Sequence, residues 1–75
     1  MKRFTIKVRA TQRGYQVKVS RDRAFQYYYR YFQSMDKAMC FVWDTAKELK
    51  AAHPRCETIN LIVDGQSQGN LLETF

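Results

Sequence analysis

The chain has 75 residues and a formal net charge of +6, and 45% of its residues are hydrophobic. This length allows one domain with one sheet and one helix and leaves no room for a second core. The hydrophobic content exceeds that of disordered segments, so we expect the chain to fold. The longest apolar run, 40–43, is far shorter than the roughly 20 residues of a membrane helix. Charged residues also interrupt the N-terminal apolar positions, and we therefore expect a cytoplasmic protein that does not enter membranes.

The first two predicted strands form a hairpin. Residues 3–9 alternate between apolar and polar side chains, which is typical of a half-buried strand. Residues 15–20 alternate in the same way, and the turn between them contains Gly14, which tolerates a positive φ.

A third strand is predicted at 25–32, because tyrosine and phenylalanine dominate this segment and aromatic side chains suit a pleated surface. Two facings are possible. We expect the one that keeps Arg30 out of the core. The side chains then expected to point inward are Phe25, Tyr27, Tyr29 and Tyr31. Those expected to point outward are Gln26, Tyr28 and Arg30.

One helix is predicted at 35–52. Ser34 is a favourable N-cap, no Gly or Pro interrupts the segment, and Pro54 prevents its continuation. Apolar and small residues recur there at helical spacing. The residues expected on its buried side are Ala38, Phe41, Val42, Thr45, Ala46, Leu49 and Ala52.

A last strand is predicted at 57–63, followed by a tail, 64–75, that could add a short fifth strand or pack on the core. The predicted fold class is therefore α+β with the order β-β-β-α-β. A right-handed crossover through the helix brings the last strand parallel to the first, beside it in the sheet. The helix covers one sheet face, and the other face stays open.

The order of elements and the segment 32–38 (Phe-Gln-Ser-Met-Asp-Lys-Ala) resemble two families. One is the arm-type DNA-binding domain of phage tyrosine recombinases, whose three-stranded sheet enters the major groove. The other comprises small bacterial and prophage proteins that share the β-β-β-α-β order and end in a Val-Asp-Gly-like turn, as at 63–65. The resemblance implies DNA binding and a phage or prophage origin. The chain departs from the recombinase arm in having a strand after the helix.

Basic residues are concentrated in the first part of the chain. Residues 1–30 contain nine of the 13 basic residues and one acid, whereas residues 31–75 contain four basic residues and six acids. Cations interleaved with an aromatic residue on a sheet face suit a nucleic acid, either DNA or RNA. A solvated face that uses cations for solubility is the alternative. The residues expected to bind nucleic acid are Arg3, Lys7, Arg9, Lys18, Tyr28 and Arg30.

A protein interface is the second functional hypothesis. Met39, Cys40 and Trp43 lie partly away from the predicted buried side of the helix, and an exposed Trp beside a Met is typical of a binding hot spot for a partner or a second copy. Alternatively, the last strand or residues 71–72 cover them.

No catalytic or metal site is predicted. Cys40, His53 and Cys56 lack the spacing of a structural zinc site, and two cysteines are fewer than disulfide-dependent domains carry, so we expect free thiols. Asp44 and Glu48 lie among lysines on the helix, and no nucleophile or phosphate-loop motif occurs. We therefore expect a binding protein without a cofactor, a small-molecule substrate or enzymatic activity.

Overall fold

The computed structural model describes residues 3–21 and 24–74, and of residues 24–28 and Thr74 it describes the backbone alone. The predicted helix has the bounds found in the structure, and the predicted strands agree to within two residues. The elements are β1 (Arg3–Thr11), β2 (Gly14–Arg21), β3 (Ala24–Phe32), α1 (Met35–Ala52), β4 (Thr58–Val63), β5 (Gln66–Asn70) and a final 3-10 turn, η1 (Leu71–Thr74).

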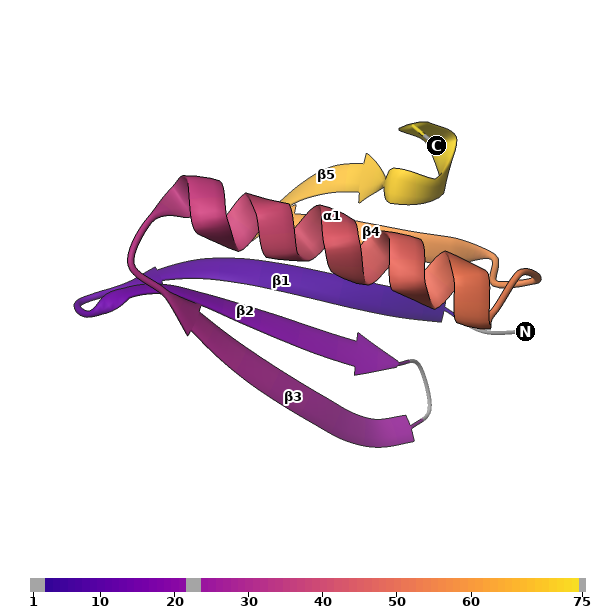
Figure 1. Ribbon diagram of the computed structural model, residues 1–75, viewed down its shortest axis with the longest axis horizontal. Helices are drawn as coiled ribbons and strands as arrows, with labels where there is room; N and C mark the ends of the chain where they lie inside the picture. The colour runs from indigo at the N-terminus through magenta and orange to yellow at the C-terminus, as the bar shows by residue number, and fades with distance from the viewer. Residues whose placement is uncertain (1–2, 22–23, 75) are drawn as a thin grey trace.

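The strands form one sheet in the order β3-β2-β1-β4-β5, and α1 packs on one of its faces (Figure 1). All neighbouring strands are antiparallel except β1 and β4, which are parallel, as the crossover predicts. The α+β prediction is confirmed, and β5 adds a fifth strand. The tail also packs on the core, because Leu71 is buried after β5 ends. None of the described helices is long and apolar enough to cross a membrane.

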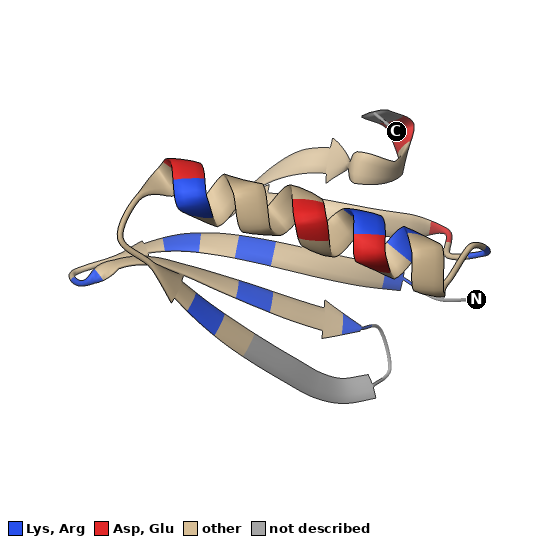
Figure 2. Cartoon of the chain, in the orientation of Figure 1, with Lys and Arg blue, Asp and Glu red and all other residues tan. Residues whose placement is uncertain are grey.

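Local capping fixes both ends of α1. The Ser34 side chain accepts a hydrogen bond of 3.3 Å from the Lys37 backbone N–H, and the His53 N–H donates to the Leu49 carbonyl at 2.8 Å. The solvent side of the helix carries acidic and basic residues in equal number (Figure 2). These exposed residues are Asp36, Lys37, Asp44, Lys47, Glu48 and Lys50.

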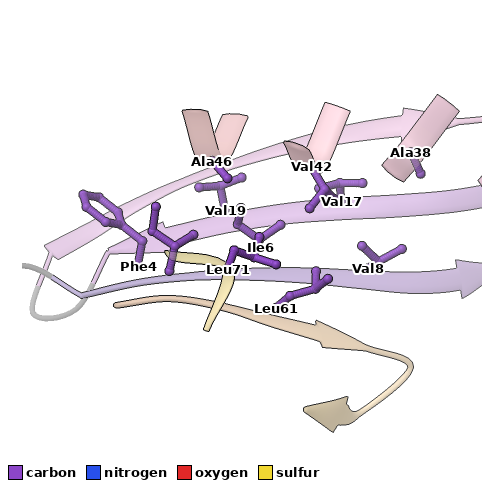
Figure 3. Close-up of a cluster of buried hydrophobic side chains, with 11 residues drawn as sticks. Phe4, Ile6, Val8, Val17, Val19, Ala38, Val42, Ala46, Leu61 and Leu71 are labelled. Atoms are coloured by element: carbon purple, nitrogen blue, oxygen red, sulfur yellow. The ribbon is translucent and has the colours of Figure 1, made fainter. Parts of the chain in front are cut away.

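The core lies between α1 and the sheet (Figure 3). Ile6 is fully buried in the central strand, where its neighbours are Val19 on β2 and Leu61 on β4. On the helix, Ala38, Val42, Thr45 and Ala46 are buried as predicted. The buried stripe is narrower than the prediction, because Phe41 and Leu49 are half-buried at its borders and Ala52 is exposed at the helix end.

The facing predicted for β3 is wrong at residues 29–31, and the side chains of Phe25, Gln26, Tyr27 and Tyr28 lie outside the described part of the structure. The sheet register pairs Tyr29 with Lys18 and Arg30 with Val17, so Arg30 lies on the helix side. Tyr29 and Tyr31 are 50% and 66% exposed on the opposite side. Because β3 is an edge strand, Arg30 stays exposed, and its guanidinium carbon lies 5.9 Å from the centroid of the Phe41 ring.

Gly14 begins β2 with a φ of 134°, and a Cβ at this position would collide with the carbonyl oxygen of Phe32 on β3. We expect Gly14→Ala to lower the free energy of unfolding by about 1–3 kcal/mol, because it combines backbone strain with a displacement of β3. Urea denaturation followed by circular dichroism measures this change. Gly65→Ala is the matched control, since a Cβ there meets no atom within 4 Å and the backbone strain alone remains.

Candidate nucleic-acid interface

The candidate site is the sheet face opposite α1, which we call the open face. In β1 and β2 the buried positions alternate with Lys7, Arg9, Gln16 and Lys18, so these four side chains point to the open face. The register arranges them in two rows across the strands. One row contains Tyr31, Gln16 and Arg9. The other contains Tyr29, Lys18, Lys7 and Ile62.

The second row brings two lysines together. Lys7 and Lys18 are directly opposite each other on β1 and β2, an arrangement that is destabilising for like charges. The Lys18 ammonium lies 5.8 Å from the centroid of the Tyr29 ring, within the range of a cation–π interaction. This row therefore offers two cations and an aromatic ring to a ligand on the open face.

A hollow of about 780 Å³ lies over this row. Asp64 is the one acid among its described lining residues, and its Oδ1 accepts a hydrogen bond of 3.0 Å from the Ala10 N–H. The Asp64 N–H donates to the Val8 carbonyl at 2.9 Å. These two hydrogen bonds hold the β4–β5 turn against β1. The other described lining residues of the hollow are cationic or uncharged. Its cationic lining residues are Lys7, Arg9 and Lys18, and its larger uncharged ones include Tyr29 and Ile62.

A second hollow of about 630 Å³ lies at the β1–β2 turn and is lined by Thr11, Gln12, Arg13 and Tyr31. The Thr11 hydroxyl donates to the Gly14 carbonyl at 3.1 Å and accepts from the Arg13 N–H at 3.3 Å, which orders the turn. Tyr29 and Tyr31 therefore line separate hollows, and each hollow is lined by at least one cation.

Three of the six residues predicted to bind nucleic acid come together. Lys7, Arg9 and Lys18 line the first hollow. Arg3 lies at the far end of β1, where its Nε forms an ion pair of 3.0 Å with Glu57. Arg30 is on the other face, and the Tyr28 side chain is outside the described part of the structure.

Tyr29 and Tyr31 were missed as site residues. The signal in the sequence is Phe32, which ends the strand with the parity opposite to that of Tyr29 and Tyr31. Phe32 packs on the core, with its ring centroid 5.2 Å from that of Phe41. Placing Phe32 in the core turns both tyrosines to the open face.

The helix positions of the second hypothesis do not form one exposed patch. Met39 and Trp43 are half-buried against the core, and Cys40 is exposed. Leu71 is buried in the same core and Leu72 packs against it. Cys40 and Cys56 are free thiols, and the described residues contain no group of three acidic, Cys or His side chains that could hold a metal ion.

Comparisons of the chain with family models, with curated proteins and with solved structures give no match. The resemblance to recombinase arm domains and small prophage proteins stays a prediction from short motifs.

Proposed function

We propose that this protein binds nucleic acid through the cations of its open face. The observation that carries the proposal is the opposed pair Lys7 and Lys18, with Arg9 beside them on β1. Adjacent like charges repel each other in the free protein, and a phosphate between them removes that repulsion. A polyanion is thus the ligand that this arrangement favours.

The distribution of charge over the molecule supports binding of the ligand to one particular face. β1, β2 and the turn between them carry six basic residues and no acid (Figure 2). The solvent side of α1, by contrast, carries equal numbers of acidic and basic residues. Of these six, Lys7, Arg9 and Lys18 lie close together on the open face. A cluster of like charges on one face attracts a polyanion and orients its approach.

The test is a titration of fluorescein-labelled oligonucleotides at several salt concentrations, read by fluorescence anisotropy. The logarithm of the association constant is expected to fall with the logarithm of salt concentration, with a slope of about −0.7 per phosphate contact on a single strand and −0.9 on a duplex. Lys7→Ala and Lys18→Ala should each weaken binding and flatten this slope by about one contact.

Lys47→Ala is the matched control, because Lys47 is exposed on the helix and its replacement lowers the net charge by the same amount. Its effect on affinity should be much smaller. Equal effects of the three substitutions would show attraction by net charge alone. That result, or no binding at low salt, would contradict the proposed site.

A further inference from the structure

The open face presents aromatic rings beside its cations. Tyr29 and Tyr31 are 50% and 66% exposed, and each lines a separate hollow. Burying these rings gains free energy, because large aromatic surfaces are favourable to remove from water. The planar faces of nucleic-acid bases are partners for such rings, and stacking on them tolerates any base.

Bases that remain stacked in a duplex cannot use both tyrosines. Residues two apart on a strand are separated by about 6.8 Å, so this is the spacing of Tyr29 and Tyr31 along β3. Successive bases of a duplex strand rise by about 3.4 Å and stack on each other. Two bases that use both rings must be unstacked, as the bases of a single strand can be.

The cations form a compact group. Lys7 and Lys18 are on neighbouring strands, which are about 4.8 Å apart, and Arg9 is two residues from Lys7 along β1. The two backbones of a duplex are separated by a major groove about 12 Å wide and a minor groove about 6 Å wide. A compact group of cations therefore fits the phosphates of one backbone better than the two backbones of a duplex.

We propose, on the basis of the function proposed above, that the ligand is a single-stranded nucleic acid. Neighbouring bases stack on Tyr29 and Tyr31, and the phosphates lie toward Lys18, Lys7 and Arg9. Arg13, in the hollow beside Tyr31, contacts the strand at the β1–β2 turn. The strand thus follows the direction of β3, with its bases over the sheet edge and its backbone over β1 and β2.

The experiment compares four fluorescein-labelled probes by anisotropy at one low salt concentration. These are an eight-nucleotide single strand in DNA form, the same strand in RNA form, a hairpin whose stem is the eight-base-pair duplex of that sequence, and a single strand of eight abasic residues. The single strand, of either sugar, is expected to bind at least about tenfold more tightly than the duplex. Tyr29→Ala and Tyr31→Ala should each weaken its binding by about 5- to 150-fold.

Three controls separate stacking from other causes. Tyr29→Phe and Tyr31→Phe should retain most of the affinity, because the ring remains. Neither alanine variant should change binding of the abasic probe, which keeps the phosphates and lacks the bases. Thermal unfolding curves of the variants should match that of the unchanged protein, since both side chains are exposed.

The possible failures are distinguishable. If the duplex binds as tightly as the single strand, or if the alanine variants bind the single strand normally, while Lys7→Ala still weakens binding, then the single-strand inference is wrong and the proposed function stands. If no probe binds at low salt, or if Lys7→Ala and Lys47→Ala have equal effects, both proposals are wrong.

Discussion

Replacement of Ile6 by alanine is expected to lower the free energy of unfolding by about 2–5 kcal/mol. Ile6 is fully buried in the central strand, between Val19 and Leu61, with α1 above it. Truncation removes apolar contacts and leaves a cavity that strands paired on both sides cannot close. Folded domains have only about 5–15 kcal/mol of stability, so a large fraction of the Ile6→Ala molecules should be unfolded at moderate urea concentrations.

Urea denaturation followed by circular dichroism measures the effect. Lys7→Ala is the control, because Lys7 is the next residue of the same strand and is exposed on the other face. Its unfolding midpoint should remain near that of the unchanged protein. An unchanged midpoint for Ile6→Ala together with a lowered one for Lys7→Ala would mean that β1 has the opposite facing.

Lys7→Glu is expected to weaken nucleic-acid binding by about 100-fold or more at low salt, because placing a like charge against a phosphate costs several kcal/mol. The same substitution should leave stability unchanged or raise it by about 0.2–1 kcal/mol. It replaces the repulsion with Lys18 by an attraction across the two strands. Such a result would show that Lys7 contributes to binding at the expense of stability.

Arg30→Glu is the matched control for this charge reversal. It changes the net charge by the same two units, but Arg30 lies on the helix side of β3 beside Phe41. Anisotropy titrations should show a much smaller loss of affinity for Arg30→Glu than for Lys7→Glu. Comparable losses in the two variants would mean that the ligand does not distinguish the two faces of the sheet.

The elements whose signals are local could be predicted from the residues alone. Alternation in β1 and β2 placed Lys7, Arg9 and Lys18 opposite a buried row, and the structure has them there. Ser34 and Pro54 limited the helix, because a cap and a missing N–H act within one turn. The parallel pairing of β4 with β1 also followed, since a crossover through a helix returns the chain in the direction of β3, which is also the direction of β1.

The facing of β3, and hence half of the candidate site, depended on the packing of the folded chain. Both sides of this strand are aromatic, so alternation could not choose between them, and the requirement to keep Arg30 solvated pointed to the wrong side. At a sheet edge Arg30 reaches solvent from the helix side, which removes that requirement. Phe32 packs against Phe41 of α1 and so lies on the helix side as well. Because successive side chains alternate across a strand, Tyr29 and Tyr31 then lie on the open face.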